Sequence, residues 1–139
     1  MKCMKQLSEN FTVEELTRST TAEQLGIDNT PDADSLENLK LLVDNVLQPL
    51  RDMYGRPIVV NSGYRCPQLN KAIGGAKTSQ HTLGKAADIT AGNKAENKRL
   101  FNLVLDGDLI FDQLIDEKDY RWIHISYNQD RNRQQILHL

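Results

Sequence analysis

The sequence predicts an α+β fold in which helices pack on a mostly antiparallel sheet. Three observations lead to this prediction. The strongest helical periodicity lies in the first half of the chain, short strand-like segments follow it, and the last two of these segments can pair as an antiparallel hairpin. A length of 139 residues fits one domain. We expect this domain to span 1–139, with a helical part at about 11–56 and the candidate site at about 57–127.

Five helical segments are expected, each with a recognisable start, stop or periodicity. Segments 11–16 and 20–26 combine polar cap residues with acidic residues in the first turn, and the second ends at Gly26. In segment 36–50, leucines and valines recur every three or four residues; Pro49 should end or bend this helix, and 50–54 can form a last turn before Gly55. Segments 66–73 and 94–105 complete the set.

Four short apolar segments are expected to form strands, namely 57–60, 86–89, 111–115 and 122–127. The polar stretch 116–121 separates the last two, which is a suitable connection for a hairpin. His138 lies next to the end of the chain, where we expect a frayed polar residue without a specific role.

The composition excludes several classes of protein. Seventeen basic against nineteen acidic residues give a net charge of −2, which offers no electrostatic support for nucleic-acid binding. No apolar run approaches the roughly 18–20 residues of a membrane span. The first lysines precede no apolar region, so we expect cytoplasmic synthesis without a signal peptide, and we expect a monomer. Two cysteines, Cys3 and Cys66, cannot build a disulfide framework.

Three residues could form a metal site. His81 lies among small polar residues, whereas His124 and Asp88 each interrupt an apolar strand. A polar group in such a strand needs hydrogen bonds, an ion partner or a metal. Two histidines and one carboxylate match the three protein ligands of a catalytic zinc site. The alternative is that His124 is a hydrogen-bonded core histidine and Asp88 a turn or cap residue.

Hydrolysis at such a site also needs a carboxylate that does not bind the metal. Candidates lie just before His124, and the alternative for each is a solvated surface charge: Asp112, Asp116, Glu117 and Asp119. Arg65 follows a glycine-containing turn after a strand, where it could hold a substrate carboxylate or lie on the surface. A cysteine hydrolase with Cys66 as nucleophile and a histidine as base is a further alternative.

The chain resembles the peptidase M15 family over about residues 11–127. This family contains zinc D-Ala-D-Ala carboxypeptidases and related phage or prophage endolysin peptidases, and its fold is shared with the zinc domain of Hedgehog proteins. The most specific part is the pattern S-x-H-x-x-G-x-A-x-D at 79–88, followed by W-x-H at 122–124. The other matching segments are 62–70 and 73–76.

The resemblance implies a role for individual residues. His81, Asp88 and His124 would be the first, second and third ligands of one zinc ion, and Arg65 would grip the substrate. Ser79 and Gln80 would form part of the substrate-binding wall before the first ligand. Trp122 would be the aromatic residue two positions before the last ligand.

The catalytic base is where the chain departs from part of the family. Several branches place an acidic residue three positions before the last histidine, and this position holds Arg121. Similar compact members instead have F-D-Q-L-I, one residue, and then glutamate, as at 111–117. The resemblance therefore implies Glu117 as the base, with Asp119 and Asp116 as substitutes.

The implied activity is that of a zinc metallopeptidase in which a carboxylate activates a zinc-bound water. Its substrates would be peptidoglycan stem peptides, cut either as by a D-Ala-D-Ala carboxypeptidase or as by an endolysin-type endopeptidase. The protein would then act on the cell wall after release from the cytoplasm. The alternative is a catalytically inactive zinc-binding or cell-wall-binding module of the same fold.

Overall fold

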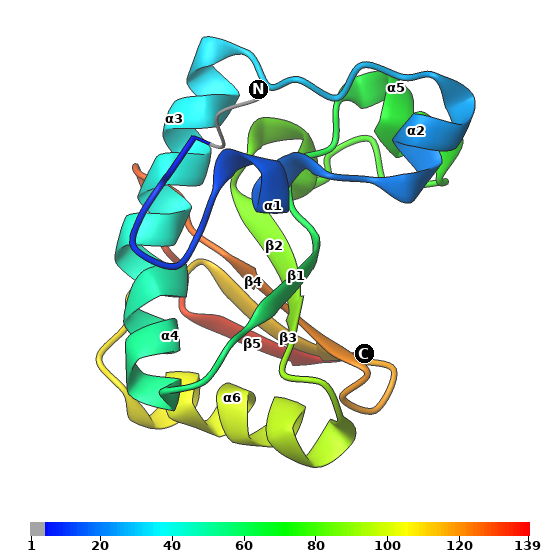
Figure 1. Cartoon of the computed structure of the whole chain (residues 1–139). Coiled ribbons are helices and arrows are strands. Elements are labelled where there is room, and N and C mark those ends of the chain that lie inside the picture. Colours follow the sequence, from blue (N-terminus) through cyan, green and yellow to red (C-terminus); the bar gives the residue numbers. More distant parts are fainter. Residues whose placement is uncertain (1–4) are drawn as a thin grey trace.

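The computed structural model describes residues 5–139 and shows one five-stranded sheet with helices packed against it (Figure 1). The strand order is β1-β2-β4-β3-β5, and all neighbours are antiparallel except β3 and β5. This arrangement confirms the predicted α+β class and the mostly antiparallel sheet. Cys3 lies outside the described residues. The strands are β1 (Val59–Ser62), β2 (Ala86–Thr90), β3 (Gln113–Glu117), β4 (Trp122–Ser126) and β5 (Gln135–His138).

Most helices begin at a polar residue whose side chain accepts a backbone N–H of the first turn. Thr12, Ser19, Asp32 and Asn93 all cap helices in this way. Within residues 5–139, no helix has the length and apolar character needed to cross a membrane. The helices are α1 (Val13–Thr17), α2 (Thr20–Leu25), α3 (Ala33–Leu42), α4 (Gln48–Tyr54), α5 (Pro67–Ala72) and α6 (Lys94–Asp106), with a π-helical turn η1 (Val43–Leu47) and a 3₁₀ turn η2 (Gln80–Leu83).

Pro49 neither ends the long helix nor separates it into two elements. The helical segments α3, η1 and α4 follow one another without a break and form one column beside the sheet (Figure 1). The π-helical turn lies immediately before Pro49, and its change of hydrogen-bond register accommodates a residue that has no N–H to donate. The helix ends at Gly55, which has a left-handed φ of +76°.

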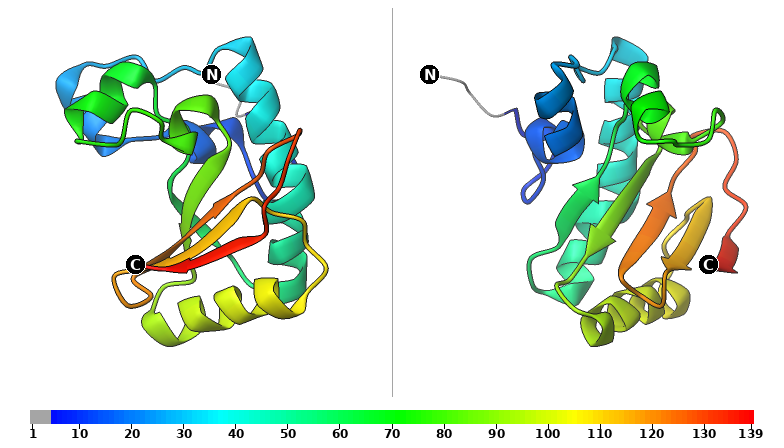
Figure 2. Two further views of the ribbon diagram at one scale, coloured as in Figure 1. Left: turned by 180° about the vertical axis from the view of Figure 1, so that it is seen from behind. Right: turned by 90° about the vertical axis from the view of Figure 1, so that its right-hand side faces the viewer.

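The helices cover one face of the sheet and leave the other face free for a site. Alternate residues of β2 and β4, such as Ile89 and Ile123, share one buried cluster with Leu42 of α3 and Leu100 of α6. Figure 2 shows the helical column behind the strands. Because side chains alternate along a strand, the residues between these core positions face away from the helices.

The last strand and its histidine were not expected. β5 pairs in parallel with β3, which places His138 opposite Asp116. His138 Nδ1 contacts the buried Asp116 carboxylate, and the His138 ring lies 5.7 Å from that of Phe101. The prediction of a frayed residue at 138 is therefore wrong, because the backbone of β3 supplies an edge on which this segment pairs.

The turn between β3 and β4 has an unusual backbone. Lys118, Asp119 and Tyr120 have positive φ angles of 49°, 58° and 63°. The buried Asn97 of α6 donates hydrogen bonds from Nδ2 to the carbonyl oxygens of Tyr120 at 2.9 Å and Arg121 at 3.1 Å. One helix side chain therefore holds the end of this turn.

Candidate metal centre

The first two residues of the site come from neighbouring strands. Asp88 of β2 lies directly opposite His124 of β4, and both side chains point away from the core. His124 Nδ1 lies 3.0 Å from Asp88 Oδ1. The antiparallel register thus brings together two residues that are 36 positions apart in the sequence.

His81 reaches the same carboxylate from the short turn η2. Its Nε2 lies 3.3 Å from Asp88 Oδ1, and its side chain is only 3% exposed. Ser79 caps η2, and Gly84 closes it with a φ of +74°. A Cβ at position 84 would lie 2.4 Å from the carbonyl oxygen of Ser35, so only glycine permits this close approach of η2 to α3.

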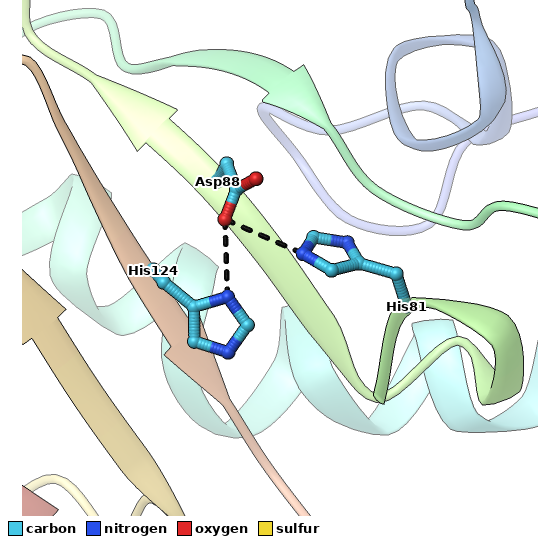
Figure 3. A group of neighbouring side chains, drawn as sticks. All are labelled: His81, Asp88 and His124. Atoms are coloured by element: carbon cyan, nitrogen blue, oxygen red, sulfur yellow. Dashed lines mark hydrogen bonds and ion pairs between the residues drawn. The ribbon is translucent and has the colours of Figure 1, made fainter. Parts of the chain in front are cut away.

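The donor atoms of His81, Asp88 and His124 converge as metal ligands do (Figure 3). One ligand atom from each residue lies within 4.8 Å of the others. His81 Nδ1 is 2.7 Å from the carbonyl oxygen of Gly63, which can only accept; Nδ1 therefore carries a proton, and in the neutral ring Nε2 is free to bind a metal ion. Two imidazoles with one carboxylate are a ligand set that suits zinc.

The charge of Asp88 fits the same role. Burial by itself raises the pKa of Asp88, but its contacts with His124 and His81 outweigh burial and hold the pKa below its ordinary value. The carboxylate is therefore ionised at neutral pH, as a metal ligand must be.

The cluster opens into a cavity of about 400 Å³ on the face of the sheet away from the core. Three of the predicted non-ligand residues, Arg65, Glu117 and Trp122, line this cavity together with the three candidate ligands. The predicted wall residues also line it, and the other residues around it are Ala76, Thr78, Gln113 and Ile115.

Arg65 is positioned by the turn that carries His81. Its backbone N–H donates to the carbonyl oxygen of His81 at 3.0 Å, and its Nη2 donates to Ser79 Oγ at 3.4 Å. Its Nε is buried and has no hydrogen-bond partner among residues 5–139. Burial lowers the pKa of Arg65, and the negative charges of Asp88 and Glu117 partly offset this effect. A free, partly desolvated donor of this kind suits an anionic group of a substrate.

Glu117 is the acidic residue that the hairpin places in the cavity. It pairs with Trp122 across β3 and β4, and Trp122 Nε1 donates to Glu117 Oε2 at 2.7 Å. This bond fixes one carboxylate oxygen and leaves Oε1 available. Trp122 thus orients the glutamate in addition to lining the cavity.

The three aspartates near Glu117 have other surroundings. Asp116 faces the opposite side of the sheet and contacts His138. Asp119 is 74% exposed and pairs with Lys94 in the turn. Asp112 is buried and paired with Arg133.

Cys66 has a structural position. Its Sγ accepts the backbone N–H of Leu69 at 3.4 Å and caps α5. In the part of the chain that the structure describes, Cys66 is not among the residues that line the cavity.

Sequence reasoning missed three residues in and around the site. Ala76 and Thr78 line the cavity from an irregular loop, where no periodicity identifies an inward face. Arg133 does not line the cavity but forms an ion pair with Asp112. Nothing in the local sequence indicates this pairing across 21 positions.

A two-histidine, one-carboxylate cluster beside an unligated glutamate and an arginine defines the class of metal-dependent hydrolases. The family model described as Peptidase M15 matches residues 9–126, so the chain belongs to the peptidase M15 family. This membership confirms the predicted family and the predicted class of enzyme, a zinc peptidase.

A curated relative supports the same assignment over a shorter stretch. The chain is 45% identical over 49 residues to a zinc D-Ala-D-Ala carboxypeptidase from Streptomyces albus G. The alignment covers 34% of this chain and 19% of that relative. Most of the relative's length therefore has no counterpart in this comparison.

Proposed function

We propose that this protein is a zinc metallopeptidase that hydrolyses peptide bonds in peptidoglycan stem peptides. The observation that carries the proposal is the convergence of His81, Asp88 and His124 on one edge of a cavity that also contains Glu117 and Arg65. The family membership and the name of the curated relative support the choice of metal and substrate.

His81, Asp88 and His124 would hold the zinc ion. Bound zinc supplies Lewis-acid chemistry, because it acidifies water and polarises a carbonyl group. Glu117 takes up the proton of the attacking water and passes it to the leaving amine. The hydrogen bond from Trp122 keeps Glu117 Oε2 in place, so Oε1 is the oxygen that carries the proton.

Arg65 would bind a substrate carboxylate. It lines the cavity, and the planar guanidinium allows a two-point contact with a carboxylate, which stem peptides carry at their C-terminus and along the chain. This chemistry suits both a D-Ala-D-Ala carboxypeptidase and an endolysin-type endopeptidase. The proposed place of action is the cell wall, after release of the protein from the cytoplasm.

Digestion of purified peptidoglycan, with and without a chelator, tests the proposal. We expect new amine groups and fragments whose masses identify the bond cut, and we expect chelator to abolish them and added zinc to restore them. Zinc-loaded protein that releases no fragment would identify an inactive zinc-binding or wall-binding module. Cleavage that chelator leaves unchanged would overturn the metallopeptidase and favour a cysteine hydrolase.

A further inference from the structure

The side chain of Gln80 connects a buried carboxylate to the third candidate ligand. Gln80 Nε2 donates to Asp112 Oδ2 at 2.7 Å, and Gln80 Oε1 lies 3.5 Å from His124 Nε2. These contacts join η2, the start of β3 and the middle of β4 on the cavity face of the sheet. A residue that only lined a substrate site would not need both ends of its amide engaged within the protein.

The chemistry of these groups determines the direction of each hydrogen bond. An ionised carboxylate only accepts, so Asp112 fixes the NH₂ end of the Gln80 amide on its own side. The amide oxygen must then face His124, and this oxygen also only accepts. Gln80 can thus accept a proton held on His124 Nε2, and with the proton there the lone pair of Nδ1 is free for a metal ion beside Asp88.

Arg133 anchors the far end of this chain of bonds. Asp112 Oδ1 accepts Arg133 Nε at 2.8 Å and the Arg133 backbone N–H at 3.0 Å, while Asp112 Oδ2 accepts Arg133 Nη2 at 3.0 Å. The contact with Arg133 lowers the pKa of Asp112 to about 2, so the carboxylate remains ionised. Arg133 lies beyond residues 9–126, the part that matches the family model.

We propose that Gln80 is a positioning residue that selects the tautomer and orientation of His124, and that Arg133 maintains it through Asp112. His124 thereby acquires the same arrangement that Gly63 gives to His81, with one ring nitrogen donating and the other free to bind metal. This inference rests on the zinc site of the proposed function and does not depend on which bond the enzyme cuts.

Zinc affinity provides a direct test, measured at one pH by competition with a metal-binding dye. Gln80→Met keeps the length of the side chain but removes both hydrogen bonds. We expect its zinc dissociation constant to rise about 10- to 100-fold, as for loss of other outer-shell partners of metal-binding histidines. The matched control is Gln24→Met on the exposed surface of α2, which should leave zinc affinity unchanged.

Two further measurements separate positioning from substrate contact. The visible absorption spectrum of the cobalt-loaded protein should change in Gln80→Met, because the orientation of a ligand has changed. In kinetics with a stem peptide, kcat should fall while KM remains within about twofold, since only the metal site is disturbed. A rise in KM with unchanged zinc affinity and cobalt spectrum would overturn the proposal and identify Gln80 as a substrate contact.

Variants of Arg133 test the remote end of the network. Arg133→Met should weaken zinc binding less than Gln80→Met, Arg133→Lys should restore part of the loss, and the exposed Arg131→Met should have no effect. Equal zinc affinity of Arg133→Met and wild type would overturn the role of Arg133, and this test remains available if Gln80→Met fails to fold. If wild type itself bound no zinc, the proposed function would fail rather than this inference alone.

Discussion

The hairpin of β3 and β4 carries a histidine–carboxylate contact on each of its faces, and the two differ in use. On the cavity face, one oxygen of Asp88 lies within 3.3 Å of nitrogens from both His81 and His124. On the core face, the carboxylate of Asp116 contacts His138, whose side chain is 67% exposed. We call these the metal cluster and the strand pair.

Their surroundings explain the difference. The metal cluster has three potential ligands around one point and a cavity beside it. The strand pair has Tyr120 and Phe101 as further neighbours, and it joins the edge strand β5 to β3. The same residue types therefore suit either a metal site or a contact between strands, according to how many ligand atoms converge and whether a cavity lies beside them.

Removing one histidine from the metal cluster and one from the strand pair tests whether only the metal cluster binds zinc. We expect His124→Ala to lose the zinc, of which wild type should hold about one equivalent per chain, and to lose activity with it. His138→Ala should retain about one equivalent, because it has no atom in the metal cluster. Metal analysis of protein purified without added metal provides the measurement. Full zinc content in His124→Ala would contradict the assigned ligand set.

The neighbouring acidic residues of β3 give the next largest effect. Glu117→Gln should keep zinc and fold but lose about 10²- to 10⁴-fold in kcat, as is typical when a general base is removed. Asp116→Asn and Asp119→Asn should have mild effects on kcat, because Asp116 faces the core and Asp119 lies in the exposed turn. An inactive aspartate variant together with an active Glu117→Gln would show that the aspartate, and not Glu117, is the general base.

Arg65 tests whether the cavity face binds substrate charge. Arg65→Ala should lower kcat/KM about 10- to 100-fold, since a hydrogen bond to a charged group contributes about 1.5–3 kcal/mol. The free energy of unfolding should change by no more than about 0.5 kcal/mol, because within residues 5–139 the guanidinium makes one long side-chain hydrogen bond, to Ser79. A drop of many degrees in Tm would instead identify Arg65 as a structural residue.

The smallest effect concerns Tyr120, beside the strand pair. Burial, then the charge of Asp116 and a side-chain hydrogen bond with it, raise the pKa of Tyr120 above its ordinary value of about 10. The folded state therefore resists ionisation of this phenol, and its contribution to stability is complete below pH 10 and declines as the pH rises further.

A comparison with Tyr120→Phe isolates this contribution. At pH 8 the variant should be less stable by about 1 kcal/mol, the value of one hydrogen bond, and the difference should shrink between pH 10 and 11. Urea unfolding of both proteins at each pH provides the measurement. A difference that stays constant with pH would show that Tyr120 does not ionise differently in the folded state.

The sequence was sufficient to predict those parts of the fold in which apolar periodicity and burial agree. Asp88 and His124 stood out because each interrupts an apolar strand, and the antiparallel register places them opposite each other. Because side chains alternate along a strand, the sequence 111–117 also puts Glu117 on one face with Gln113 and Ile115, and all three line the cavity.

The remaining features depend on partners that are distant in the sequence. β5 has half-exposed and exposed residues in alternation, and it is a strand because β3 offers it a free edge. The orientation of Gln80 depends on Asp112, 32 positions later, and the charge of Asp112 depends on Arg133. Local propensity contains no signal for such pairings, which form only when the tertiary structure does.

The turn between β3 and β4 affects which parts of the molecule unfold together. Three successive non-glycine residues with left-handed φ each cost roughly 1–2 kcal/mol. Asn97 holds this turn from α6, so the hairpin retains its shape only while the helix is docked. Amide hydrogens of α6 and of the hairpin should therefore exchange with solvent deuterium as one cooperative unit, and separation of that helix would release Glu117 from its position in the cavity.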